Sequence, residues 1–235
     1  MNIGLDEPLQ LLHTARFGTL ATRSRDDGCP YPTVLPFAPD ARHRPVLLVS
    51  RLAEHTRNLQ ADAHAGFLVF EGCTADVLAG PRTTLTGRAV PSECATGGAG
   101  SPARRYLRYH PDAERYLQLG DFTFFTLVPA KLRHIGGFGA MGWLDAHELN
   151  PIAPLDDAEE AALLDDIAPA LPAGIRLLGI DRYGVDFERD RVRARQTFAP
   201  ARPDEASGEA FAPASIKTAL ETAIAAITSN SSPMR

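Results

Sequence analysis

Between residues 15 and 136 the chain repeats short runs of β-branched, aromatic and leucine side chains, each followed by a turn or a loop. Runs of this length indicate strands, because a helix needs a longer amphipathic pattern. We expect strands over Phe17–Thr22, Tyr31–Phe37, Val46–Val49, Gly66–Phe70, Arg82–Val90, Asp121–Val128 and Ala130–Ile135. Many closely spaced strands with few helices between them predict a small antiparallel β-barrel, closed or partly closed.

Glycines and prolines add detail to these strands. Asp26–Gly28 is typical of a tight hairpin turn. Pro32 and Pro36 cannot donate backbone hydrogen bonds, so we expect their strand to be irregular or to lie at an edge. Gly87 predicts a β-bulge. Gly136–Trp143 is predicted to be a glycine-rich turn, and it does not fit the GxGxxG pattern of a dinucleotide site.

Five helices are expected, and the last two belong to a second domain. They cover Leu5–Thr14, Glu54–Asp62, Pro102–Leu117 (interrupted at Pro111), Ala158–Ala168 and Ser215–Thr228. The composition changes near Asp145, after which three short antiparallel strands are expected at Ile175–Ile180, Val185–Glu188 and Val192–Phe198. The chain is therefore predicted to be mainly β, with a barrel over residues 1–145. A small α+β domain with a disordered tail follows over residues 146–235.

Composition excludes several classes of protein. The 235 residues carry a net charge of -5, which argues against bulk nucleic-acid binding. No apolar run is long enough to span a membrane, and the N-terminus lacks a signal-peptide pattern, so a cytoplasmic location is expected. Cys29, Cys73 and Cys94 are widely spaced and form no CxxC pair. Neither a disulfide framework nor a metal site is indicated.

The clearest concentration of polar side chains follows the strand Val46–Val49. Six lie at the junction where that strand meets the helix after it: Ser50, Arg51, His55, Thr56, Arg57 and Asn58. A helix start offers unpaired N–H groups and the positive end of the helix dipole, which suits a phosphate. Hydroxyl, guanidinium and imidazole groups would add charge-assisted hydrogen bonds. The same residues would also serve as an ordinary surface turn that caps a helix.

In chain order, five segments resemble one known family. They are GTLAT in the first strand, PTVLPFA in the second, SRLAEHTRNL at the turn and helix, FLVF, and GPRTTLTGRA. Together they resemble the FMN-binding split barrel of the pyridoxamine 5'-phosphate oxidase-like superfamily, most closely its haem-utilisation (HugZ-type) branch. The resemblance covers residues 5–145. The segment IDRYGVDFERDRVRARQTF also resembles the end of the small α+β domain in that branch.

The resemblance implies a homodimer with FMN at its interface, a small-molecule partner, and flavin-dependent oxidoreductase chemistry on a small or planar substrate. Thr33 would lie on the strand that faces the flavin ring, and Arg82 would reach across to the flavin. The phosphate and ribityl end would be held by Ser50, Arg51, His55, Thr56 and Asn58. The resemblance identifies no catalytic residue.

Two alternatives to this function stay open. The first is a haem-binding or haem-degrading protein, with the propionates on Arg104, Arg105 or Arg108. The second is a non-catalytic flavin-binding module. No C-terminal arginine-and-histidine motif is present, which argues against vitamin B6 oxidation. No histidine follows His147, so iron ligation by a tail histidine does not transfer to this chain.

Two further residues have both a functional and a structural interpretation. His134, at the end of the predicted barrel, would either ligate haem, face the flavin or be a hydrogen-bonded structural histidine. Trp143 would either line an aromatic ligand or be buried with its N–H paired.

Overall fold

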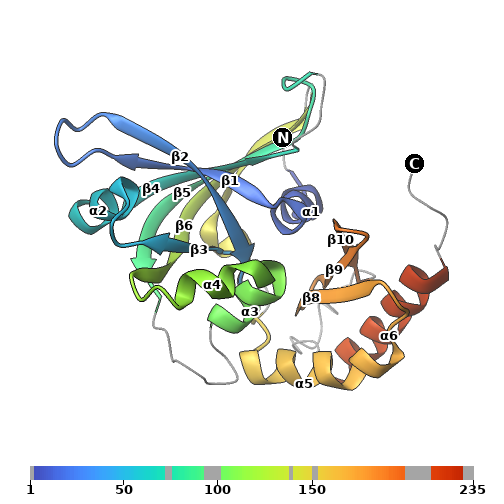
Figure 1. Cartoon of the computed structure of the whole chain (residues 1–235). Coiled ribbons are helices and arrows are strands. Elements are labelled where there is room, and N and C mark those ends of the chain that lie inside the picture. Colours follow the sequence, from blue (N-terminus) through green and yellow to red (C-terminus); the bar gives the residue numbers. More distant parts are fainter. Residues whose placement is uncertain are drawn as a thin grey trace. The chain divides into compact units, whose positions relative to one another are not determined.

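The computed structural model describes residues 3–71, 76–92, 102–137, 140–149, 153–198 and 213–229. The chain divides into two compact units, Met1–Pro151 and Ile152–Arg235 (Figure 1). Cys73, Cys94 and residues 230–235 of the predicted tail lie outside the described residues. Among the described helices, none is both long and apolar enough to cross a membrane. The cytoplasmic location stays a prediction.

Seven antiparallel strands build the first unit: β1 (Phe17–Arg23), β2 (Pro30–Pro39), β3 (Pro45–Ser50), β4 (His64–Phe70), β5 (Arg82–Pro91), β6 (Phe122–Gly137) and β7 (Ala140–Asp145). Their order is β3-β2-β1-β4-β5-β6-β7. An additional pairing of β3 with β6 closes six of them into a barrel, and β7 lies outside the closure. The predicted split-barrel fold is therefore confirmed.

The bulge at Gly87 is confirmed as well. The β5–β6 register shifts between Thr86 and Gly87, where Gly87 opposes Pro129. A Cβ at Gly87 would lie 2.1 Å from the Val128 carbonyl oxygen, so a side chain does not fit there. The strand β6 runs through this point without a break, so the prediction of two separate strands was wrong.

The predicted glycine-rich turn was also wrong over most of its length. β6 continues to Gly137, and β7 begins at Ala140 and carries Trp143. The segment lacks the β-branched residues that usually mark a strand, but β6 offers it a ladder of partners from Lys131↔Asp145 to Gly137↔Ala140, with a register shift between Ile135 and Gly137. Tertiary pairing therefore overrides local propensity.

The proline-rich strand β2 has an open edge, as expected. Residues 30–36 pair with β1 alone, and only Phe37, Ala38 and Pro39 pair with β3. The open portion carries Pro32 and Pro36, whose missing N–H groups cost nothing where no neighbouring strand needs them.

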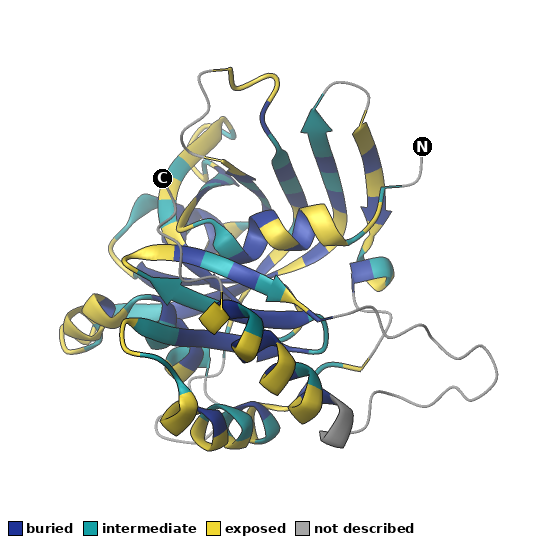
Figure 2. Cartoon of the chain, turned by 90° about the vertical axis from the view of Figure 1, so that its right-hand side faces the viewer, coloured by how far each residue is buried: buried dark blue, intermediate teal, exposed yellow. Residues whose placement is uncertain are grey.

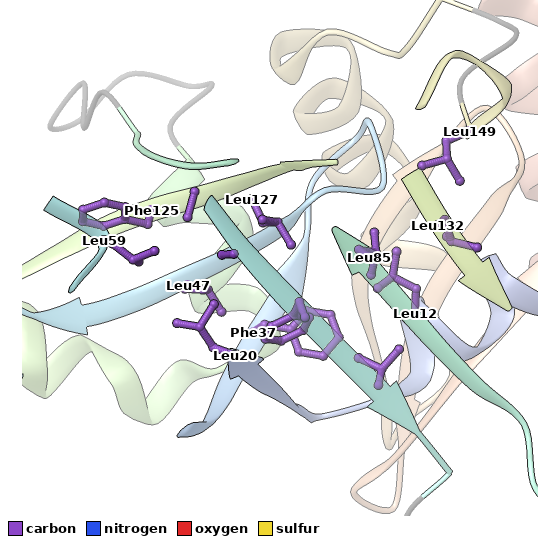
Figure 3. Packing of buried hydrophobic residues seen from close by; sticks show 14 of the residues in the cluster. Leu12, Leu20, Phe37, Leu47, Leu59, Leu85, Phe125, Leu127, Leu132 and Leu149 are labelled. Carbon is purple, nitrogen blue, oxygen red and sulfur yellow. The ribbon is translucent and has the colours of Figure 1, made fainter. Parts of the chain in front are cut away.

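Leucine and phenylalanine side chains fill the barrel (Figure 3). Helix α1 (Asp6–Thr14) contributes Leu11 and Leu12 to this core, and α2 (Glu54–Ala61) contributes Leu59. The long predicted helix is broken at Pro111, as expected, into α3 (Pro102–Tyr109), a 3-10 turn η1 (Pro111–Ala113) and α4 (Glu114–Leu117). A second 3-10 turn, η2 (Ala146–Leu149), follows β7. Buried residues alternate with more exposed ones along β1 and β4, whereas β3 is buried from Pro45 to Val49 (Figure 2).

The second unit is a three-stranded sheet with helices, as predicted. Its elements are α5 (Asp157–Ile167), η3 (Ala168–Ala170), β8 (Ile175–Asp181), β9 (Gly184–Arg189), β10 (Val192–Thr197) and α6 (Pro213–Ser229), and the strand order is β10-β9-β8. Asp156 caps α5 in a capping box with Glu159. The buried Arg195 donates to Asp181 and Asp186, each at 2.6 Å.

Candidate ligand site at the β3–α2 junction

The turn between β3 and α2 is held by hydroxyl groups. The Ser50 Oγ donates to Asp121 Oδ2 at 2.6 Å and accepts a hydrogen bond from the Leu52 backbone N–H at 3.1 Å. The Thr56 Oγ1 donates to the Ser50 carbonyl oxygen at 2.6 Å. A hydroxyl has one proton to donate, and both protons are committed to acceptors within the protein.

Arg51 is exposed and anchors the segment before β6. Its backbone N–H donates to the Asp121 carbonyl oxygen at 2.8 Å, and its guanidinium donates to the Gly120 carbonyl oxygen at 2.7 Å. A guanidinium has five N–H groups, so Arg51 retains donors that face solvent. The other arginine of the junction, Arg57, is half-buried and lies 3.7 Å from Glu54 Oε2, so Arg51 is the more accessible of the two cations.

Asn58 ties α2 to the β1–β2 hairpin, which lies beside it in Figure 1. Its side chain is buried, and its Nδ2 donates to the Thr22 Oγ1 at 3.1 Å. Its Oδ1 accepts from the Arg25 backbone N–H at 3.1 Å. These contacts give Asn58 a structural task that the sequence did not suggest.

Two polar side-chain atoms at the predicted site are buried and have no hydrogen-bond partner among the residues that the structure describes. One is the Nε2 of His55, whose side chain lies in the first turn of α2 and is 8% exposed. The other is the Oγ1 of Thr33, which pairs with Leu20 across the β1–β2 ladder. Burial lowers the pKa of His55, so its ring is neutral at physiological pH. An unpaired buried polar atom is costly, and a bound polar group would relieve that cost.

Arg82 lies apart from these residues within one chain. Arg82 pairs with Phe70, the last residue of β4. Two residues earlier in β4, Leu68 pairs with Thr19, which is near the start of β1. Arg82 is therefore level with the start of β1, whereas Asn58 of α2 contacts Thr22 near the other end of that strand. The Arg82 guanidinium donates to carbonyl oxygens of its own loop, at Val77, Leu78 and Gly80.

His134 is completely buried, and both of its ring nitrogens are engaged. Its Nδ1 is 2.8 Å from the Thr83 Oγ1, and its Nε2 is 3.3 Å from Glu7 Oε2. Burial lowers the pKa of His134, and Glu7 partly offsets this shift. With neither nitrogen available to a ligand, the structural interpretation of His134 holds.

Two other sequence-based interpretations change. Arg105 is buried and its Nε donates to the Pro39 carbonyl oxygen at 2.8 Å, while Arg104 is exposed. The three arginines that the haem alternative offered to the propionates therefore differ in exposure, since Arg108 is half-buried. Trp143 is 57% exposed rather than buried, and the Arg133 guanidinium lies 5.4 Å from the centre of its ring.

Sequence reasoning did not identify Asp121 as a member of this junction. It is 71 positions from Ser50 along the chain, and it was noted only as the first residue of an expected strand. The pairing of Ser50 with Phe122 across β3 and β6 brings it to Ser50. No local pattern marks such a contact.

A model of the CREG β-barrel family matches residues 9–150, which include every strand of the barrel and the whole junction. The chain belongs to the CREG β-barrel family. This family match and the closed six-stranded barrel agree with the split-barrel resemblance that the sequence motifs predicted.

Individual relatives of this CREG β-barrel protein extend the comparison. It is 32% identical over 165 residues to the chloroplastic non-canonical heme oxygenase HOZ of Arabidopsis thaliana, an alignment that covers 70% of this chain. The alignment covers 48% of HOZ, so the chain spans about half the length of that relative.

Two solved structures share the fold over nearly the whole chain. Protein Atu2129 of Agrobacterium tumefaciens, described as of unknown function, has a TM-score of 0.71 and 23% identity, covering 94% of each chain. A heme binding protein of Mycobacterium smegmatis has a TM-score of 0.58 and 24% identity, covering 95% of this chain and 98% of its own. At this identity the two structures support the fold alone.

Proposed function

We propose that the barrel binds haem and that the protein takes part in haem breakdown or another step of haem handling. The observation that carries this proposal is the 32% identity to heme oxygenase HOZ, because that alignment covers 70% of the chain. Haem breakdown would make the chain an enzyme, and haem binding alone would make it a carrier.

The residues at the β3–α2 junction fit the chemical groups that haem presents. A haem carboxylate needs a cation, and Arg51 is exposed with N–H groups to spare. A ligand at this junction would also give the unpaired Nε2 of His55 a hydrogen-bond partner. Haem, when bound, supplies the redox chemistry of its iron. The protein would orient the haem and shield part of it from water.

A second copy of the chain is proposed to complete the site. On the outward face of the sheet, one residue from each of six neighbouring strands lies in a single row: Val34, Thr19, Leu68, Thr84, Arg133 and Trp143. A neighbouring row carries the exposed Phe17, Phe70 and Met141. Five large apolar side chains on this face are exposed, which is typical of a surface that another molecule covers: Phe17, Val34, Phe70, Met141 and Trp143. Arg82 lies on the same face, so in a symmetric dimer it would approach the partner's site.

FMN binding with flavin-dependent oxidoreductase activity is the second candidate. The start of α2, with the exposed Arg51 beside it, suits a phosphate, and the buried hydroxyl of Thr33 has an unused hydrogen-bonding capacity. Against it, the protons of Ser50 and Thr56 already have acceptors. The same site without turnover would be a non-catalytic flavin-binding module.

Parallel titrations of the full chain with haemin, FMN and riboflavin test the choice. Haem binding gives a shifted Soret band that saturates at a fixed haemin-to-protein ratio, and flavin binding changes flavin fluorescence. We expect haemin to bind more tightly than FMN. Saturable FMN binding without haemin binding would overturn the haem proposal, and turnover of a dye by the flavin-loaded protein would then separate an oxidoreductase from a module.

A further inference from the structure

A carboxylate lies among the groups that were expected to hold an anion. Asp121 Oδ2 accepts the Ser50 hydroxyl proton at 2.6 Å, and the Asp121 carbonyl oxygen accepts the Arg51 backbone N–H at 2.8 Å. Both donors belong to the junction where a phosphate was predicted. The side chain of Asp121 is only partly buried, so its charge is felt by any ligand at this surface.

This arrangement has two consequences for a phosphate ester. Its oxygens would have to take the Ser50 proton from Asp121, because a hydroxyl donates only one. A dianionic phosphate would also lie within a few ångströms of a like charge, and at such distances charges near a protein surface interact strongly. A carboxylate ligand carries a single charge, so it meets about half of that repulsion.

We propose that Asp121 is a specificity-determining residue of the β3–α2 junction, which makes the site favour a singly charged carboxylate ligand over a dianionic phosphate ester. The inference rests on the proposed function, since it assumes that a ligand's acidic group lies against Arg51. In this proposal Asp121, which lies outside the motifs identified in the sequence, makes the site prefer haem-type ligands to FMN-type ligands.

Two substitutions at Asp121 separate the effect of its charge from the effect of its hydrogen bond with Ser50. Asp121→Asn removes the charge and keeps an oxygen that accepts the Ser50 proton. Asp121→Ala removes both the charge and the acceptor. Asp190→Asn is a matched control, because Asp190 is exposed in the β9–β10 turn of the second unit and its replacement changes the net charge equally. Its left-handed backbone conformation, with φ of 51°, is one that asparagine tolerates.

The test measures the affinities of FMN, riboflavin and haemin for the full-length wild type and the three variants. In Asp121→Asn we expect FMN affinity to rise about tenfold, riboflavin affinity to stay constant, and haemin affinity to change by less than about threefold. The gain for FMN should shrink at high salt, because salt screens an exposed charge. Asp190→Asn should leave all three affinities unchanged.

The outcomes distinguish this inference from the proposed function. Unchanged FMN affinity in both Asp121 variants, or equal gains for FMN and riboflavin, would overturn the role of Asp121. Failure of the wild type to bind haemin would overturn the proposed function, while the ratio of FMN to riboflavin affinity would still report on Asp121. A gain for FMN in Asp121→Ala but not in Asp121→Asn would show that the hydrogen bond, not the charge, is responsible, and would also overturn the inference.

Discussion

Two buried histidines at separate places on the barrel differ in one respect that matters for function. His134 on β6 and His55 on α2 are both buried, and burial lowers the pKa of each. Both ring nitrogens of His134 have partners, whereas the Nε2 of His55 has none among the described residues. Burial alone therefore does not separate a structural histidine from a candidate ligand-binding histidine. The two differ in whether their ring nitrogens already have hydrogen-bond partners.

The difference follows from where each ring lies in the fold. Thr83 pairs with His134 across β5 and β6, so the strand register itself supplies the first partner. Glu7, in the first turn of α1, supplies the second. His55 lies in the first turn of a short helix, where no strand register supplies a partner.

We expect the largest effect on stability from replacing His134, because both of its ring nitrogens have hydrogen-bond partners. His134→Ala leaves the buried Thr83 hydroxyl without its partner and opens a cavity, so we expect a loss of about 2–4 kcal/mol of unfolding free energy. Haemin affinity of the folded variant should stay at the wild-type value. Urea denaturation and Soret titration measure the two quantities. His64→Ala, at an exposed position, is the control and should change neither.

The opposite result is expected at the other histidine. His55→Leu replaces an unpaired polar ring by an apolar side chain, so stability should change by less than about 1 kcal/mol. Haemin affinity should fall about tenfold and the Soret maximum should move, because the ligand loses a polar contact. A large loss of stability with unchanged haemin affinity would show that His55 is structural too, and the comparison would fail.

We expect acid pH to destabilise the folded protein through the rings of both His55 and His134. In the unfolded chain each histidine binds a proton near pH 6.5, whereas in the folded protein burial lowers the pKa of both rings, so each ring takes up its proton only at a lower pH. The unfolded state then binds more protons, so stability falls as the pH drops below 6.5. Each group contributes at most about 1.4 kcal/mol per pH unit. Urea midpoints from pH 8 to pH 5 measure the slope, and His55→Leu should reduce it. An unchanged slope in that variant would contradict the assignment.

The smallest effect is expected at the exposed partner of His134. Glu7→Gln keeps an oxygen that accepts a hydrogen bond and removes only the charge of a side chain that is 72% exposed. Pairs of this kind contribute roughly 0–1 kcal/mol. Thermal unfolding should therefore differ from wild type by a degree or so at pH 7.5. A larger loss would mean that Glu7 holds α1 on the barrel by more than this contact.

The class of fold could be predicted from the sequence, and the candidate site at the β3–α2 junction stays a prediction from the same source. Short β-branched runs gave the strands, Gly87 marked the bulge, and the alternation of strand and helix around Ser50 identified the junction. The motifs SRLAEHTRNL and GPRTTLTGRA indicated a split-barrel protein, and the comparison with known proteins then showed the CREG β-barrel family. These features are local, because each depends on the order of a few neighbouring residues.

The tertiary structure was needed to see which polar groups already have hydrogen-bond partners. Strand pairing brings Asp121 to Ser50 over 71 positions, and it brings Thr83 to His134. The same pairing turns a glycine-rich segment into β7 and leaves Trp143 exposed. Whether a side chain is free to bind a ligand depends on such long-range contacts, since a donor or acceptor used inside the protein is lost to the ligand. Residue types along the chain do not contain that information.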